Sequence, residues 1–284
     1  MKKQKIINFI LGLLYPLRLH RLRDLPGLWI AVIRYYLVPA DPLKSFPPVE
    51  TAMKHPDGLL AIGGSFSTQR LLDAYRNGIF PFSHLPPIKW WAPENRMVLI
   101  PEEIHIEKNV RRLLRRKIYS VTFDKAFRDV ILACQEPREK KKPLTWINDK
   151  NITAFCQLFE NGNAHSVEVW DDQKHLIGGI FGISIGAVFF NESQFSRIRD
   201  TSKLAMAYLN CHLYNWGYQI HDCMKFSSHL ERLGAHLIPR AQFSMLLNKW
   251  CDKQCVQGLW KIDQNLDVAQ CLTEMMNKHK CNTT

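Results

Sequence analysis

Apolar residues recur along most of the chain with periods that predict alternating helices and strands. Spacings of three and four residues predict helices within residues 67–77, 104–119, 124–134, 150–160, 200–217, 227–234 and 240–249. Shorter runs typical of strands lie at residues 119–123, 164–170, 176–183, 187–190 and 218–223. This order favours an α+β fold, with a largely antiparallel sheet and helices that cross it.

Polar residues mark the expected starts of several of these helices. Ser67 or Thr68 can cap the first helix, and Asp124 can cap the helix that follows the strand at 119–123. Asp200 or Thr201 can start the longest helix. By composition the chain then divides into four segments. They are a basic, apolar N-terminal extension (1–45), a small N-terminal domain (46–97), a larger domain (98–250) and a polar C-terminal tail, helical or loose (251–284).

The extension differs from the rest of the chain in charge. It carries eight Lys or Arg residues against two Asp, a net charge of 8 − 2 = +6. Its apolar runs, Ile6–Leu14 and Leu28–Ile33, are shorter than the roughly 20 residues that span a membrane. No small-x-small cleavage site follows the first run, which argues against a signal peptide. Two interpretations stay open: a helical extension docked on the core, or a basic amphipathic segment that rests on a membrane.

Composition narrows the class of protein. The 284 residues are 46% hydrophobic and 23% charged, which excludes wholesale disorder, collagen-like repeats and a small disulfide scaffold. Lys and Arg outnumber Asp and Glu by 38 to 26, so the formal net charge is +12. This excess favours a polyanionic partner, either a nucleic acid or an anionic membrane surface.

The eight cysteines include no Cys-x-x-Cys pair. They indicate reduced thiols and a reducing, cytoplasmic compartment. Cys251 and Cys255 leave a zinc site with nearby histidines as a weaker alternative.

Six cations crowd the segment 104–119. Most of them share one helical face, while Val110, Leu113 and Leu114 can face the core. The cations are Lys108, Arg111, Arg112, Arg115, Arg116 and Lys117. Such charges repel one another unless an anion offsets them, so a phosphate backbone is a natural partner. The alternative is a solvated face with diffuse counterions.

The glycines do not form a phosphate-binding loop. The chain has no G-x-x-x-x-G-K-[ST], no G-x-G-x-x-G and no loop of the kind that holds acetyl-CoA. The glycines of 178–186 lie within strand-like sequence, where they mark a bulge or a close approach of a ligand or another backbone.

Two carboxylates are candidates for chemistry. Asp222 ends a buried-looking strand, where it can orient an amine or accept its proton, or else cap the helix that follows. Glu192, near Arg197 in an aromatic setting, forms either an ion pair or a substrate clamp. No Ser–His–Asp triad follows from spacing. A structural role is favoured over a catalytic one for three histidines, His165, His221 and His229.

An ordered set of motifs runs from about Phe46 to Phe243. It comprises Asp57-Gly-Leu-Leu-Ala-Ile-Gly-Gly64, Asn77-Gly-Ile-Phe-Pro-Phe82, Trp90-Trp-Ala-Pro93 with Arg96, Thr145-Trp-Ile147, Asn163-Ala-His-Ser-Val-Glu-Val-Trp170, Gly178-Gly-Ile-Phe-Gly182, Glu192-Ser-Gln-Phe-Ser-Arg197, Ser202-Lys203, Asp222-Cys223, Leu233-Gly-Ala235 and Ile238-Pro-Arg240. Each motif alone is weak, but together they resemble the leucyl/phenylalanyl-tRNA–protein transferases.

The resemblance implies a small N-terminal α/β domain and a larger catalytic domain like the Gcn5-related acyltransferases. It implies an enzyme that takes Leu or Phe (sometimes Met) from aminoacyl-tRNA. The enzyme attaches it to proteins with N-terminal Lys or Arg and so creates an N-degron. The family's tRNA-binding helix corresponds to residues 108–117. An aminoacyl ester is already activated, so positioning the attacking α-amine can suffice, and no metal or cofactor is needed.

The resemblance also assigns site residues. Asp222 would orient or help deprotonate the attacking amine, and Glu192 would lie near the aminoacyl-adenosine end. The other expected substrate-binding residues would be Trp91, Trp146, Ile180, Phe190, Gln194, Met224 and Ser227. For the two tryptophans, Ile180 and Phe190, the alternative is plain packing in the core.

Two positions depart from the family pattern. The family usually has Asp-x-Gln where this chain ends in Met224, and Glu-Ser-Met-Phe where this chain has Gln194. One hypothesis is that the two side chains are neighbours and have exchanged places. If they are not neighbours, Gln194 adds an amide to the pocket for the donor side chain. A buried amide needs a hydrogen-bond partner, so the enzyme would then favour a more polar donor amino acid.

Two other functions stay open from the sequence. One is an aminoacyl-tRNA-dependent transferase with a different donor or acceptor, such as a cell-wall peptide or a lipid amine. The other is a non-catalytic relic that binds charged tRNA, for which Met224 is the main support.

Overall fold

The computed structural model describes residues 23–37, 45–136 and 145–282. The chain divides into two compact units. Unit 1 comprises Met1–Glu94, Gln135–Ala154 and Pro239–Ser244, and unit 2 comprises Asn95–Cys134, Phe155–Ile238 and Met245–Thr284. Unit 2 thus starts close to the expected boundary at 97, but unit 1 also takes two later segments. The apolar run Ile6–Leu14 lies outside the described residues.

Unit 1 holds a three-stranded antiparallel sheet in the order β1-β3-β2. Its elements are α2 (Leu25–Leu37), η3 (Val49–Thr51), β1 (Leu59–Ile62), α3 (Thr68–Arg76), β2 (Phe80–Pro81) and β3 (Lys89–Trp91). Ser67 caps α3 as expected, because its hydroxyl accepts a hydrogen bond from the Arg70 backbone N–H at 3.3 Å. Trp90 is fully buried, and its indole N–H donates to the Gly63 carbonyl at 2.8 Å.

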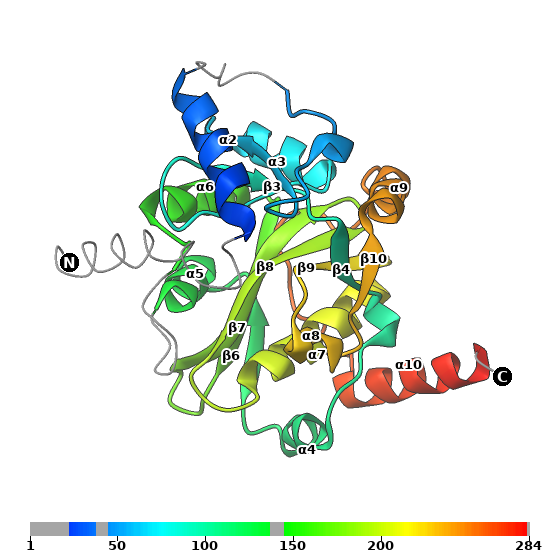
Figure 1. Ribbon diagram of the computed structural model, residues 1–284. Coiled ribbons are helices and arrows are strands. Elements are labelled where there is room, and N and C mark those ends of the chain that lie inside the picture. The colour runs from blue at the N-terminus through cyan, green and yellow to red at the C-terminus, as the bar shows by residue number, and fades with distance from the viewer. Residues whose placement is uncertain (1–22, 38–44, 137–144, 283–284) are drawn as a thin grey trace. The chain divides into compact units, whose positions relative to one another are not determined.

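Unit 2 is built around a seven-stranded sheet (Figure 1). Its order is β10 (His236–Pro239), β4 (Asn95–Leu99), β9 (Ile220–Met224), β8 (Val188–Ser196), β7 (Leu176–Ile185), β6 (Ala164–Trp170) and β5 (Ser120–Phe123). Pairing is antiparallel from β5 to β8 and between β4 and β9, and parallel between β8 and β9. The expected α+β class with a largely antiparallel sheet is confirmed.

Helices lie on both faces of this sheet. Adjacent residues of a strand point to opposite faces. A Cβ at Gly178 would lie 2.5 Å from the Thr201 hydroxyl on one face, and a Cβ at Gly179 would lie 3.3 Å from Val130 on the other. The remaining helices are η4 (Pro101–Glu103), α4 (Lys108–Arg116), α5 (Phe127–Gln135), α6 (Asp149–Glu160), α7 (Thr201–Asn215), α8 (Ser228–Glu231), α9 (Arg240–Trp250) and α10 (Val268–Asn282).

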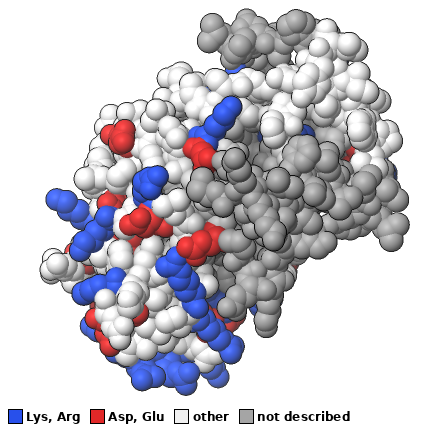
Figure 2. Space-filling model, turned by 90° about the vertical axis from the view of Figure 1, so that its left-hand side faces the viewer, with Lys and Arg blue, Asp and Glu red and all other residues white. Residues whose placement is uncertain are grey.

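The basic helix expected over 104–119 is shorter. Helix α4 covers only Lys108–Arg116, because Ile104 and Ile106 are extended and both are buried in the core. The His105 backbone N–H between them donates to the Leu233 carbonyl at 2.9 Å. Figure 2 shows Lys and Arg side chains gathered at the lower end of the molecule, the end at which Figure 1 shows α4.

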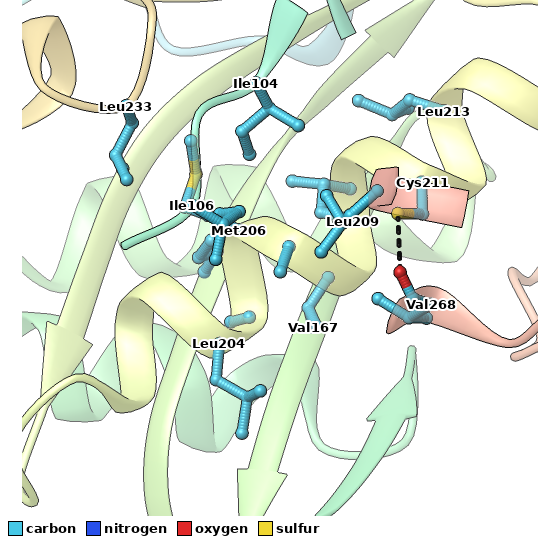
Figure 3. Close-up of a cluster of buried hydrophobic side chains, with 14 of the residues drawn as sticks. Ile104, Ile106, Val167, Leu204, Met206, Leu209, Cys211, Leu213, Leu233 and Val268 are labelled. Carbon is cyan, nitrogen blue, oxygen red and sulfur yellow. Dashed lines mark hydrogen bonds between the residues drawn. The ribbon is translucent and has the colours of Figure 1, made fainter. Parts of the chain in front are cut away.

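The core of unit 2 lies between the sheet, α7 and the segment that leads into α4 (Figure 3). Leu204, Met206 and Leu209 of α7 are all at most 2% exposed. The thiol of Cys211 donates to the Val268 carbonyl at 3.8 Å, so the start of α10 is held against α7. The C-terminal segment is thus partly helical, as expected, and also contributes to the core.

Asp124 does not cap α5, contrary to expectation. It has a positive φ of 54°, and its carboxylate accepts hydrogen bonds from three other groups. They are the His165 ring Nδ1 at 2.7 Å, the Ser166 N–H at 2.8 Å and the Trp260 N–H at 2.6 Å. Asp124 therefore joins β6 to the segment before α10.

Three further observations concern the described residues alone. None of the helices there has both the length and the apolar character needed to cross a membrane. No group of three or more His, Cys, Asp or Glu residues in that part of the chain could hold a metal, so the zinc alternative at Cys251 and Cys255 gains no support. Cys156, Cys211, Cys223, Cys255 and Cys271 are reduced thiols, as expected.

Candidate active site

A fully buried ion pair lies at the end of β9. The Arg96 guanidinium, on β4, binds both oxygens of Asp222, with Nε–Oδ1 2.8 Å and Nη2–Oδ2 2.6 Å. The side chains are 1% and 0% exposed. The Met224 backbone N–H also donates to Asp222 Oδ1 at 2.9 Å. Because the carboxylate is held from three directions, its position is fixed before any substrate binds.

Sequence reasoning gave Asp222 a role but none to Arg96. The sequence did offer one indication that Arg96 has a buried partner, because Arg96 is the single cation at the start of the apolar run 96–100. A charge within a buried strand needs a charged partner. The partner itself could not be read from the sequence, since it lies 126 residues away. The carboxylate does not cap the helix that follows, because α8 has Ser227 at its N-cap position and no side-chain cap there.

Strand β8 bulges next to this pair. It pairs in parallel with β9 up to Phe190, which lies beside Asp222. Along β7 the register then shifts between Asn191 and Ser193, so Glu192 is the extra residue. A bulge re-aims side chains and often borders a functional site. The glycines of 178–186 were expected to mark a bulge or a close approach. The extra residue, half-buried Glu192, lies in β8 opposite this segment, and a Cβ at Gly182 would lie 2.2 Å from the Phe190 carbonyl oxygen, so the close approach of another backbone is confirmed.

The bulge also decides which face Gln194 occupies. Directly opposed residues on neighbouring strands share a face of the sheet. Gln194 lies opposite Ile180, which belongs to the core that includes α7. Phe190, beside Asp222, lies opposite Ile183, an odd number of residues from Ile180 and so on the other face.

The hypothesis that Gln194 and Met224 have exchanged places stays a prediction. Gln194 lies on the α7 side and Asp222 on the other side, but Met224 follows a register shift between β4 and β9 and lies opposite Met97, which belongs to the core that includes α7. Met224 has a positive φ of 65° at the end of β9; its backbone N–H donates to Asp222 Oδ1, and its sulfur accepts from Arg96 Nη2 at 2.9 Å. A part for Gln194 in donor choice stays a prediction.

A neutral histidine lies in β9 beside the ion pair. His221 is completely buried, and its Nδ1 lies 3.0 Å from the Asn210 side-chain oxygen. The Asn210 amide nitrogen donates to the Met206 carbonyl, so its oxygen is the acceptor and His221 Nδ1 carries the proton. Burial lowers the pKa of His221 to about 3. His221 is thus a structural, uncharged residue at neutral pH, in line with the sequence interpretation.

Two of the expected substrate-binding residues, Trp91 and Trp146, lie in unit 1. The Trp91 indole N–H donates to the Phe82 carbonyl at 2.8 Å. The Phe82 ring lies 6.1 Å from the Trp146 ring, centroid to centroid. Phe82, which sequence analysis quoted in a motif without a role, therefore brings Trp91 and Trp146 together although they are far apart in the chain.

The other expected substrate-binding residues lie in unit 2. Ile180 on β7 and Phe190 on β8 are fully buried. Ser227 is half-buried, and its backbone N–H lies 3.2 Å from the Met97 sulfur. Contact of any of these residues with a substrate stays a prediction.

Five of the six expected cations are exposed, four on α4 and one, Lys117, at its C-cap. Val110 and Leu114 are buried as expected, and Leu113 is half-buried. Arg111 differs, because its Nε donates to the Ile106 carbonyl at 2.8 Å and its side chain is half-buried. The exposed cations, called the basic cluster below, are Lys108, Arg112, Arg115, Arg116 and Lys117.

The N-terminus of α4 is tied to that of α7. Lys203, on α7, binds Glu107 Oε2 at 2.7 Å and Asp200 Oδ1 at 3.0 Å. Glu107 directly precedes α4. The basic cluster is therefore presented by a helix whose start is anchored on the core.

Comparisons with known proteins match this architecture to one family. The model of the leucyl/phenylalanyl-tRNA protein transferases matches residues 98–248, and that of their N-terminal domain matches residues 64–94. A relative from Methylococcus capsulatus is 44% identical over 224 residues, 78% of this chain and 94% of its own. One from Aromatoleum aromaticum is 46% identical over 226 residues, 79% of this chain and 94% of its own. Both are named leucyl/phenylalanyl-tRNA–protein transferase.

These matches place the chain among the aminoacyltransferases. It belongs to the leucyl/phenylalanyl-tRNA–protein transferase family. The resemblance seen in the ordered motifs is confirmed.

Similarity to solved structures is weak by comparison. A structure of L-PGS from Bacillus licheniformis gives a TM-score of 0.32 at 10% identity, covering 56% of this chain and 51% of that chain. An acetyltransferase of the GNAT family from Staphylococcus aureus gives 0.23 at 11% identity, covering 42% and 68%.

Proposed function

We propose that this enzyme transfers Leu or Phe from aminoacyl-tRNA to the α-amine of proteins that begin with Lys or Arg. The observation that carries the proposal is the family match, which spans 94% of the length of the relatives quoted above. The product would carry a new N-terminal Leu or Phe that acts as a degradation signal. Because the donor is charged tRNA, the reaction takes place in the cytoplasm.

The chemistry needs positioning more than activation. The α-amine attacks the ester carbonyl, an amide bond forms, the ester bond breaks, and the tRNA hydroxyl leaves with a proton that the amine gives up. An α-amine has a pKa near 8, so an appreciable fraction is neutral at pH 7. Holding amine and ester together can supply roughly 7–11 kcal/mol of the barrier. No metal or cofactor enters this scheme.

Asp222 suits the task of orienting the amine. Arg96 fixes the position of the carboxylate, whose oxygens have lone pairs beyond those that Arg96 and Met224 use. Glu192, at the neighbouring bulge, would contact the aminoacyl-adenosine end. Phe190, on the same face of the sheet as Asp222, would contact the donor side chain, whereas Ile180 lies on the other face, in the core with α7.

The basic cluster on α4 would bind the tRNA backbone. Replacing Arg112, Arg115 and Arg116 by Gln keeps good helix formers but removes three exposed cations. We expect weaker binding of charged tRNA, and a slope of log K against log salt that is shallower by about 2–3, since each lost phosphate contact removes about 0.7–0.9. Equilibrium binding over a salt series measures both quantities.

Lys249, Lys253 and Lys261 provide a matched control for the basic cluster, because they are also exposed cations of unit 2. Their joint replacement by Gln should leave the salt slope within about 1 of the original. Equal slopes for the α4 variant and the unaltered protein would show that α4 is a solvated face with diffuse counterions.

The acceptor is tested with peptides that differ only at the first residue. With Phe-tRNA as donor, we expect transfer to Arg- and Lys-initiated peptides and at least about tenfold less to an Ala-initiated peptide. Comparable transfer to all three would remove the proposed acceptor rule while keeping the transferase activity. Transfer to a lipid amine or a cell-wall peptide alone would favour the alternative acceptor named above.

The sequence also left open a peripheral membrane contact through residues 1–45. The described part of that segment is α2, and it supports this second proposal through one specific observation, the exposure of its apolar side chains.

A further inference from the structure

Helix α2 exposes a row of large apolar side chains. The helix has no buried residue. The exposed fractions of its side chains reach 61% for Trp29, 65% for Ile30, 52% for Ile33, 71% for Tyr36 and 75% for Leu37. These positions follow the spacing i, i+1, i+4, i+7 and i+8, so they form a single helical face. No other described segment exposes so many large apolar residues in a row.

The opposite face of α2 is already used within unit 1. A Cβ at Gly27 would lie 2.1 Å from the His55 carbonyl oxygen, so the helix backbone approaches that segment closely. The Tyr35 ring packs on Gly63, where a Cβ would lie 2.1 Å from a ring carbon. Asp24 Oδ1 lies 3.7 Å from His55 Nδ1. Since α2 is held by this face, the exposed apolar face cannot be explained as the side that faces the core.

Charge identifies what would cover the apolar face. Arg34 is exposed on α2 and Arg23 is exposed just before it, whereas Asp24 is the single acid among residues 23–37. The sequence of residues 1–45 has a net charge of +6. A face that joins apolar side chains to flanking cations matches an anionic membrane surface, where each cation contributes about 1 kcal/mol. A second copy of the same basic segment would instead be repelled.

The dimensions and residue types agree with this partner. Thirteen residues of α-helix extend about 20 Å, which is too short to span a bilayer but sufficient to lie in its surface. Trp29 and Tyr36 have an apolar body and a polar tip, the combination that favours the level of the lipid headgroups.

We propose that α2 lies in the plane of an anionic membrane surface, with Trp29, Ile30, Ile33, Tyr36 and Leu37 inserted between the headgroups. The membrane would hold the enzyme without changing the reaction at Asp222. The proposal goes beyond the transfer activity and does not depend on it.

The test measures binding of the full-length protein to vesicles of phosphatidylglycerol and of phosphatidylcholine. We expect binding to the phosphatidylglycerol vesicles that weakens with salt, and little binding to the neutral ones. The double variant Ile30→Asp/Ile33→Asp should bind at least about tenfold more weakly, because two charges replace inserted apolar groups. Its transfer activity in lipid-free buffer should stay unchanged, which shows that the variant is folded.

The matched control is Met245→Asp/Leu259→Asp. These residues are 65% and 59% exposed and lie outside α2, so this variant should bind vesicles as the unaltered protein does. Failure of the unaltered protein to bind phosphatidylglycerol vesicles would overturn the proposal. So would equal loss in both variants, or a dimer that the α2 variant alone abolishes, since the apolar face would then belong to a second copy.

Discussion

Replacement of Arg96 by Met destabilises the protein by about 3–5 kcal/mol, because it leaves the Asp222 carboxylate buried without its cation. The two side chains are 1% and 0% exposed, so water cannot take the place of the guanidinium. Chemical denaturation measures the loss as a lower unfolding midpoint. Arg199→Met is the matched control, because its side chain is 86% exposed and the change should cost less than about 0.5 kcal/mol.

The double variant Arg96→Met/Asp222→Leu separates stability from chemistry. Removing both charges should restore most of the lost stability, because no unpaired buried charge remains. Aminoacyl transfer should stay at least about a hundredfold reduced if Asp222 orients the attacking amine. Full recovery of transfer together with stability would show that the pair serves the fold alone. A cost below about 1 kcal/mol for Arg96→Met would contradict the buried pair itself.

Replacement of Trp260 by Ala has an effect of similar size, about 3–5 kcal/mol. Trp260 is 1% exposed and stacks on the His165 ring at 3.9 Å, with the two planes 2° apart. It also meets the rings of Phe123 and Trp216. The large cavity left by the indole is lined by rigid rings that cannot collapse into it. Thermal or chemical unfolding measures the loss.

Leu259→Ala is the control for Trp260. The neighbouring leucine is 59% exposed, so its truncation should change stability by less than about 0.5 kcal/mol. Equal, small effects at both positions would show that the segment before α10 is a loose tail, as one reading of the sequence allowed. The larger loss at Trp260 would show that it closes the core of unit 2.

Much of the fold follows from local patterns. The apolar patterns predicted α3, α5, α6 and α7 and the strands β5 to β9. The helices bury apolar residues at helical spacing over several turns, and β6 to β9 are short runs that are buried on both faces of the sheet. The start of the basic helix was predicted wrongly. Ile104 and Ile106 fit a helical period, but their two-residue spacing also fits an extended segment, and tertiary packing decided between them.

The site was less accessible to sequence reasoning. The ordered motifs predicted roles for Asp222, Glu192, Trp91 and Trp146, but not the residues that form hydrogen bonds or ring contacts with them. Arg96 and Phe82 act through contacts between distant segments, which no local spacing encodes. The face that Gln194 occupies depends on a single extra residue in β8, which reverses the alternation.

The most direct test of the central claim measures transfer from charged tRNA. Leu-tRNA and Phe-tRNA, radiolabelled in the amino acid, are incubated with the protein and an Arg-initiated peptide. The account predicts label in the peptide from both donors, and its loss with Asp222→Asn. Binding of the charged tRNAs without transfer of label to the peptide would contradict the account and favour a tRNA-binding relic.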